Sequence, residues 1–115
     1  MKEYLLLFYN QSGNGQYINS PEDMLEVMPK WQQWIGNIAM QGKLVSSKPI
    51  EFDGTIVDQK GVQNGPFIQQ QILLTGYLIC KAESIAEVTD WSKSCPILKY
   101  EKGSVEIRPI MPFEI

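Results

Sequence analysis

The chain has 115 residues, of which 43% are hydrophobic and 20% charged, and its formal net charge is -3. This length accommodates one domain, residues 1–115, and no second one. The acidic balance and the scattered Lys and Arg residues argue against nucleic acid or an anionic membrane as partners. No apolar run is long enough to cross a bilayer, and the N-terminal residues lack the order of a secretory signal. We therefore expect a cytoplasmic protein.

The sequence contains no histidine. This absence removes the commonest general base and metal ligand from any site. The two cysteines, Cys80 and Cys95, have neither the CxxC spacing of a redox or zinc motif nor histidines to complete a metal set. We expect two buried free thiols, no metal and no cofactor.

The first predicted element is a strand at residues 3–10, which is apolar on both alternating faces. That pattern is typical of a strand whose sheet is covered on both sides. A loop over residues 11–19 should lead to a helix that Ser20 caps and that runs to about Gln41. Pro29 is expected to kink or divide this helix. Its apolar stripe comprises Met24, Val27, Met28, Trp31, Ile35 and Ile38.

The middle of the chain predicts a hairpin. Residues 43–52 have extended character, Asp53-Gly54 is a turn signal, and residues 55–59 form a second short extended run. Residues 60–65 are polar and contain two glycines, which predicts a loop before Pro66 and Phe67.

The last third of the chain predicts strand, helix and strand. Residues 72–82 are strand-like, and Ser84 with Glu87 forms a capping-box signature for a helix that ends before Pro96. The alternation over residues 104–109 predicts a final strand, with Val105 and Ile107 on one face and Glu106 and Arg108 on the other. Of the tryptophans, Trp31 and Trp91 are assigned to packing, and Trp34 to packing or a partly exposed shoulder.

This order of elements predicts an α+β fold, a ferredoxin-like βαββαβ unit with an added hairpin and an antiparallel sheet. Two helices cover one face of a four-stranded sheet, yet the first strand is apolar on both faces. Another copy of the same sheet would cover the second face economically. We therefore expect a homodimer whose sheets enclose a cavity.

Motifs over nearly the whole chain also carry a family resemblance. They are the tryptophan pair, Gly42-Lys43-Leu44-Val45, Asn64-Gly65-Pro66-Phe67, Gly76-Tyr77, Ala82-Glu83-Ser84, Cys95-Pro96 and Val105-Glu106-Ile107-Arg108-Pro109. Together they resemble the YCII-related (DGPF-domain) family of the dimeric α+β barrel superfamily. The resemblance implies a ferredoxin-like fold, a homodimer, a pocket in each protomer and no generally established reaction.

The sequence departs from this family where chemistry would lie. Some relatives carry a His-Asp pair proposed to be catalytic, which a chain without histidine cannot reproduce. The acid that opens the usual Asp-Gly-Pro-Phe motif is Asn64, and residues 68–72 read IQQQI where relatives tend to carry Glu and Lys. Asn64 can donate and accept hydrogen bonds but cannot act as a general base.

Arg108 is the first candidate site residue. On the face away from the helices, its guanidinium would point into the dimer cavity and bind a carboxylate or phosphate, or else form a structural ion pair. Asn64, Gly65, Pro66 and Phe67 are candidates for a pocket rim with Phe67 as its apolar wall, or for a rigid loop that plugs the core. Tyr77 and Tyr9 present hydroxyls to the cavity or pack with satisfied hydroxyls.

The catalytic residues stay unknown, with Asp58 and Tyr9 as candidates. Asp53 and Asp58 lie nearest the predicted hairpin and would act as a base if burial raised the pKa, or else form a turn and a solvated charge. The sequence favours a small-molecule-binding homodimer without catalysis. A cofactor-free isomerase, lyase or oxygenase, in which Asp58 or Tyr9 is the base and Arg108 stabilises an oxyanion, stays open. A structural or regulatory dimer stays open too.

Overall fold

The computed structural model describes residues 1–11 and 21–113. Its main sheet has the strand order β2-β6-β1-β7, and neighbouring strands are antiparallel. These strands are β1 (Lys2–Gln11), β2 (Leu44–Pro49), β6 (Ile72–Ala82) and β7 (Ser104–Pro109). Because β6 lies between β1 and β2, the chain has the split βαβ arrangement that the sequence predicts, and the ferredoxin-like α+β fold is confirmed.

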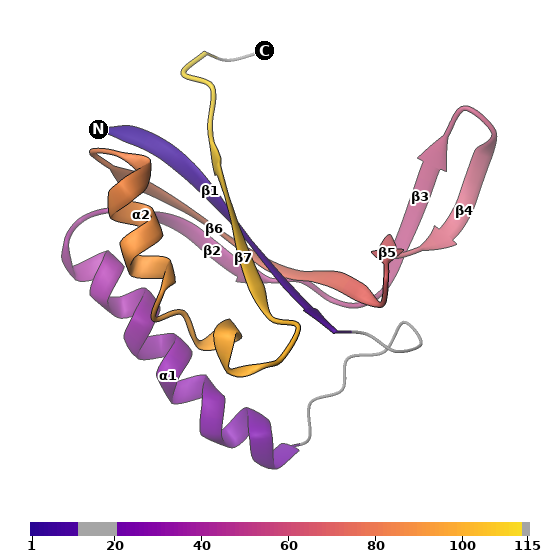
Figure 1. The fold of residues 1–115 in the computed structure, drawn as a ribbon. Helices are drawn as coiled ribbons and strands as arrows, with labels where there is room; N and C mark the ends of the chain where they lie inside the picture. Colours follow the sequence, from indigo (N-terminus) through magenta and orange to yellow (C-terminus); the bar gives the residue numbers. More distant parts are fainter. Residues whose placement is uncertain (12–20, 114–115) are drawn as a thin grey trace.

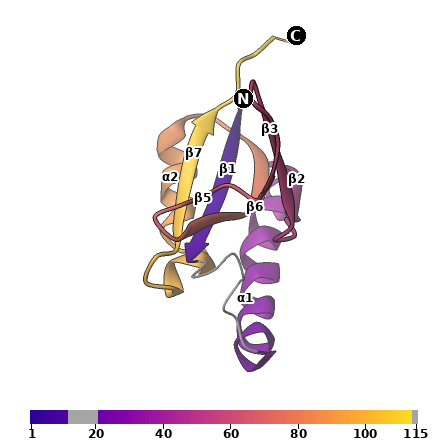
Figure 2. The ribbon, with the colours of Figure 1, turned by 90° about the vertical axis from the view of Figure 1, so that its right-hand side faces the viewer.

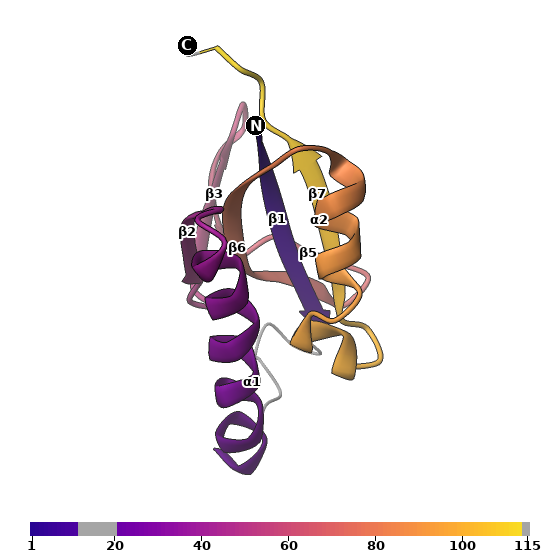
Figure 3. The same cartoon turned by 90° about the vertical axis from the view of Figure 1, so that its left-hand side faces the viewer.

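Helices α1 (Pro21–Met40) and α2 (Ile85–Ser92) and the short 3-10 helix η1 (Pro96–Lys99) cover one face of this sheet (Figure 3). Helix α1 is not divided at Pro29. Leu25, whose carbonyl the Pro29 ring crowds, lies with Pro29 on the solvent side, where water can bind that carbonyl. Ser84 caps α2 as predicted, since its hydroxyl accepts a hydrogen bond from the Glu87 N–H at 3.4 Å. The Ser20 cap and most of the predicted 11–19 loop lie outside the described residues.

The core fills the space between the sheet and the helices. Tyr4, Leu6 and Phe8 of β1 point into it, and the rings of Phe8, Trp31 and Trp34 meet edge to face, with centroids 5.1 to 6.0 Å apart. Trp34 is only 7% exposed, so it is a packing residue rather than an exposed shoulder. Cys80 and Cys95 are buried free thiols, as predicted.

Two strands outside the main sheet form a separate ribbon, which we call the arm. In it, β3 (Gly54–Asp58) pairs with β4 (Gly61–Gly65). The fold thus has an added hairpin, as predicted, but the predicted strands of the hairpin are wrong, because residues 44–49 pair with β6 and residues 61–65, expected as a loop, form β4. The turn lies at residues 59–60 instead of 53–54: Asp58 is opposite Gly61, the Asp58 carboxylate accepts a hydrogen bond from the Lys60 N–H at 2.8 Å, and Gly61 has a φ of 126°. Gly54 instead lets the arm close on Pro66, since a Cβ there would lie 2.9 Å from the Pro66 Cα.

The second face of the sheet, which we call the open face, has no described helix over it (Figure 2). The arm rises on this side of the sheet and gives the molecule an L shape (Figure 1), with principal extents of 42 × 40 × 19 Å. Leu5, Leu7 and Ile79 lie half-buried on the open face. In the described part of the chain, no helix is both long and apolar enough to cross a membrane.

Candidate functional site

A cavity of about 610 Å³ opens where the arm joins the sheet, and we call it the arm cleft. Three parts of the chain form it: the end of β1 together with the start of β6, the connection from β2 to the arm, and the segment that follows the arm. The lining residues are Tyr9, Ile50, Glu51, Asp53, Pro66, Phe67, Gln69, Gln70, Ile72, Leu73 and Leu74. Because Tyr9 and Leu74 are register partners on the open face, the cleft borders that face.

A tight turn shapes one wall of the arm cleft. Strand β5 (Ile68–Gln69) pairs with the start of β6, and Gln70 and Gln71 connect them with φ values of 54° and 64°. Two positive φ values define a two-residue hairpin turn that Asn and Gly normally occupy. Glutamine in this conformation is strained, and such strain concentrates at functional sites. The turn directs the chain so that Gln69 and Gln70 line the cleft.

Tyr9 is the polar group best placed for chemistry in the arm cleft. Its hydroxyl donates a hydrogen bond of 2.8 Å to Glu106, whose other carboxylate oxygen lies 3.6 Å from the Arg108 guanidinium. Burial, followed by the hydrogen bond to Glu106, raises the pKa of Tyr9 above its ordinary value of 10.0. Tyr9 therefore keeps its proton at neutral pH and is suited to donate a hydrogen bond or a proton, not to act as a base.

The charges of the arm cleft have one sign. Glu51 and Asp53 are its ionisable acids, and no Lys or Arg is among the described residues that line it. Phe67, Ile72 and Leu74 supply apolar surface, while Tyr9, Gln69 and Gln70 supply hydrogen-bonding groups. Such a lining favours a neutral polar or cationic molecule over an anion.

The structure brings together some of the predicted site residues. Pro66, Phe67, Tyr9 and Asp53 all line the arm cleft. Phe67 is 69% exposed, so its ring does not plug the core. Asn64 and Gly65 precede the cleft on β4, where Asn64 is opposite Thr55 and Gly65 packs on Gly54.

Other predicted residues lie away from the arm cleft. Arg108 is on the open face as predicted, but it is opposite Leu5, whereas the cleft begins at Tyr9, which is opposite Ser104. The Tyr77 hydroxyl lies 3.3 Å from the Ser46 hydroxyl. Asp58 stands at the turn of the arm, where it also accepts a hydrogen bond from the Gln63 amide at 2.8 Å.

Several residues that line the cleft belong to no motif that would identify them in the sequence. Ile50 and Glu51 reach the cleft because β2 ends at Pro49 and the chain then crosses toward the arm. The IQQQI segment was notable in the sequence only for its amide side chains. Its turn contains no Asn or Gly, the residues from which a hairpin turn is normally predicted. Among residues 1–11 and 21–113, no group of three or more His, Cys, Asp or Glu side chains is arranged to hold a metal ion.

The chain can be compared with known proteins in three ways. No curated protein shows significant sequence similarity to the chain. The solved structure of 5-chloro-2-hydroxyhydroquinone dehydrochlorinase (TftG) from Burkholderia phenoliruptrix AC1100, in complex with 2,5-dihydroxybenzoquinone, is 20% identical in sequence. It aligns over 89% of this chain and 90% of its own length, with a TM-score of 0.49. The model of the YCII-related domain matches residues 3–114, so the chain belongs to the YCII-related domain family.

Proposed function

We propose that this protein is a homodimer that binds a small molecule in the cavity between the two sheet faces, at the arm cleft. The observation that carries the proposal is the position of this 610 Å³ cleft at the border of an uncovered apolar sheet face. Cavities of this size are typical of small-molecule sites. In this proposal the protein acts in the cytoplasm and needs no cofactor.

The apolar residues of the open face favour a second copy of the chain packed against it. Leu5, Leu7 and Ile79 lie side by side there, and each is only half-buried. Burial of such residues stabilises by roughly 25 cal/mol per Å² of apolar surface. Sheets pack well face to face, and a two-fold axis makes one patch complementary to itself.

The arm supports the same arrangement. A two-stranded ribbon alone is marginally stable in water. Val57 and Val62 are opposite each other in the arm, and each is 73% exposed. The arm stands on the open-face side of the sheet (Figure 1), where a second protomer would lie beside it. Contact with that protomer would cover both valines.

Catalysis is the second candidate function, and the Tyr9 and Glu106 pair favours it. A phenol that donates to a carboxylate beside a cleft is placed to move a proton. Because Tyr9 stays protonated at neutral pH, it would be the proton donor of such a reaction and not the base. The reaction would be a cofactor-free isomerisation, elimination or oxygenation.

The homodimer is tested by the molar mass of the 13.1 kDa chain in solution. Light scattering at micromolar concentration should give twice this mass for the wild type. Leu7→Glu, on the open face, should give the monomer with an unchanged circular dichroism spectrum. Leu25→Glu is the matched control, because Leu25 is 78% exposed on α1. A monomeric wild type, or dissociation caused equally by both variants, would contradict the homodimer.

The ligand site is tested with three probes of similar size and different charge: benzamide, benzylamine and benzoate. Amide resonances of Gln69 and Gln70 should shift with benzamide or benzylamine at lower concentrations than with benzoate. Phe67→Ala should weaken binding at least fivefold. Phe113→Ala removes a ring that is similarly exposed, at 66%, outside the cleft, and should change nothing. A stable dimer that binds none of the probes would instead favour a structural or regulatory dimer without a ligand.

A further inference from the structure

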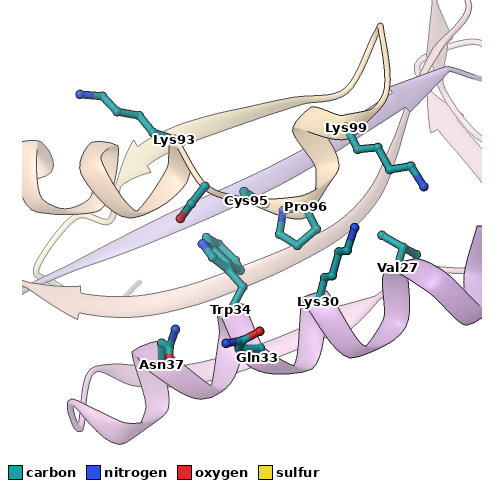
Figure 4. Close-up of a pocket in the computed structure, with 10 residues that line it drawn as sticks. Val27, Lys30, Gln33, Trp34, Asn37, Lys93, Cys95, Pro96 and Lys99 are labelled. Carbon is teal, nitrogen blue, oxygen red and sulfur yellow. The ribbon is translucent and has the colours of Figure 1, made fainter.

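A second cleft lies on the helix side of the sheet, between α1 and residues 93–99, and we call it the helix cleft (Figure 4). Its volume is about 470 Å³. The lining residues are Val27, Lys30, Gln33, Trp34 and Asn37 of α1, with Lys93, Ser94, Cys95, Pro96 and Lys99 opposite them. The sheet and the core separate it from the open face, so it is independent of the arm cleft.

The floor of the helix cleft is apolar and rigid. Trp34 is 7% exposed and Cys95 3%, and Val27 and Pro96 lie beside them. The Trp34 indole N–H donates a hydrogen bond of 3.0 Å to the Trp91 carbonyl. Because this bond fixes the indole and uses its only donor, a molecule in the cleft would meet the small exposed part of the ring as apolar surface.

The rim of the helix cleft is basic and rich in hydrogen-bond donors. Three lysines and the amides of Gln33 and Asn37 line it, and no carboxylate is among the described lining residues. Figure 4 shows Lys30 rising from α1 toward the segment that carries Pro96. The arm cleft has the opposite character, with two carboxylates and no lysine in its described lining.

The acids near this rim hold the lysines unequally. Lys99 is committed to Asp23, at 2.6 Å, and also lies 3.6 Å from Glu26. The Lys30 to Glu26 and Lys93 to Asp90 pairs are longer, at 3.6 and 3.7 Å, and all four side chains are more than half exposed. Exposed pairs of this kind are weak, so a bound anion can compete for Lys30 and Lys93.

We propose that the helix cleft binds a small organic anion with a flat apolar body. The carboxylate or phosphate of the ligand lies at Lys30, with Lys93, Gln33 and Asn37 around it, and the body rests against Trp34. The site is complete within one protomer and does not depend on the homodimer. The two clefts thus select molecules of opposite charge.

Titration of 1-naphthoate into nitrogen-15-labelled protein at low salt tests the proposal, with neutral 1-naphthalenemethanol as the comparison. The side-chain amides of Gln33 and Asn37 and the Trp34 indole N–H should shift with 1-naphthoate at concentrations at least tenfold below those needed for the alcohol. Lys30→Glu should weaken 1-naphthoate binding at least tenfold. Lys60→Glu makes the same change of charge on the arm and should leave the affinity within twofold.

Equal weakening by Lys30→Glu and Lys60→Glu would overturn the proposal, because the anion would then respond only to net charge. Equal binding of the acid and the alcohol would overturn it as well. Shifts confined to Gln69 and Gln70 would place the probe in the arm cleft, which excludes the helix cleft as the anion site but leaves a ligand site at the arm cleft. Each result can be read with the fold intact, since Lys30 is 58% exposed.

Discussion

The Tyr9 hydroxyl donates to the Glu106 carboxylate at 2.8 Å, although the two residues are 97 positions apart. The register explains the contact: β1 pairs with β7 so that Ser104 is opposite Tyr9 and Glu106 is opposite Leu7. Tyr9 and Glu106 are therefore diagonal neighbours on the open face. One side chain of this pair lines the arm cleft, and the other lies beside Arg108. The pair thus connects the cleft to the face that a second protomer is proposed to cover.

Tyr9→Phe should change the dependence of stability on alkaline pH. The raised pKa means that folded protein holds the Tyr9 proton more tightly than unfolded protein does. The stabilisation is therefore complete below pH 10.0, the ordinary pKa, and is lost as the pH rises through the higher folded pKa. At pH 8, Tyr9→Phe should lower the free energy of unfolding in urea by at most about 1 kcal/mol, because the hydrogen bond is partly exposed.

The deficit of Tyr9→Phe relative to wild type should shrink between pH 10 and 12, as the wild type loses the same stabilisation. Glu106→Gln is the matched variant, because it keeps an acceptor and removes the negative charge that adds to the effect of burial in raising the pKa of Tyr9. It should retain the hydrogen bond and show a weaker alkaline loss. A deficit for Tyr9→Phe that stays constant across this range would contradict the assignment.

The two faces of the sheet were predictable from the sequence because side chains alternate along a strand. The apolar residues of β1 and the pattern of SVEIRP place Val105 and Ile107 toward the core and Glu106 and Arg108 on the open face. A rule with a period of two needs no knowledge of the neighbouring strands. It does not give the position of Arg108 along the sheet, which depends on register.

The arm was not predictable in the same way. Most of its residues are exposed on both faces, so no burial pattern distinguishes its strands from a loop. The Asp53-Gly54 signal gave the wrong turn because Gly54 serves a close contact with Pro66. The lining of the arm cleft depends on the same contact. The Asn-Gly-Pro-Phe motif identified Pro66 and Phe67 as site residues, but only the folded structure shows that Glu51 and Gln70 lie beside them.

Gly103→Ala should be strongly destabilising. A Cβ at this position would lie 1.8 Å from the Ile97 carbonyl oxygen, and that backbone belongs to η1. Relief of such a clash costs about 1–3 kcal/mol or more. Gly36→Ala is the matched control, since its Cβ would meet nothing within 4 Å on α1 and alanine is the better helix former by roughly 0.5–1 kcal/mol. Thermal unfolding should rank Gly36→Ala above wild type and Gly103→Ala below it; equal stability of the two variants would contradict the packing.

Both cysteine thiols should be unreactive in the folded protein. Burial raises the pKa of Cys80 to about 11 and that of Cys95 to about 12, so neither forms much thiolate near neutral pH. With Ellman's reagent at pH 8, wild type should react only at the rate at which it unfolds, and two thiols should react at once in guanidinium. Cys80→Ala and Cys95→Ala assign the two signals. Fast reaction of either thiol in native protein would show that its residue opens locally.

The ion pair between Asp23 and Lys99 ties the start of α1 to the end of η1, and it should give stability at intermediate pH. The hydrogen bond from Lys99, followed by that from Tyr100, lowers the pKa of Asp23 below its ordinary 3.8. The hydrogen bond to Asp23 raises the pKa of Lys99 above 10.5. The contribution is therefore complete between pH 3.8 and 10.5, and is lost as the pH falls through the lowered value or rises through the raised one.

Asp23→Asn should lower the free energy of unfolding at pH 7, and the deficit relative to wild type should vanish as the pH is lowered toward 2. Glu22→Gln removes the same charge from the same first turn of α1 and is the control. Both variants lose an acid near the positive helix end, where a negative charge is stabilising. Only Asp23→Asn also loses the contact with η1, so it should be the less stable of the two at pH 7. Equal deficits would mean that the ion pair adds nothing beyond the charge at the helix end.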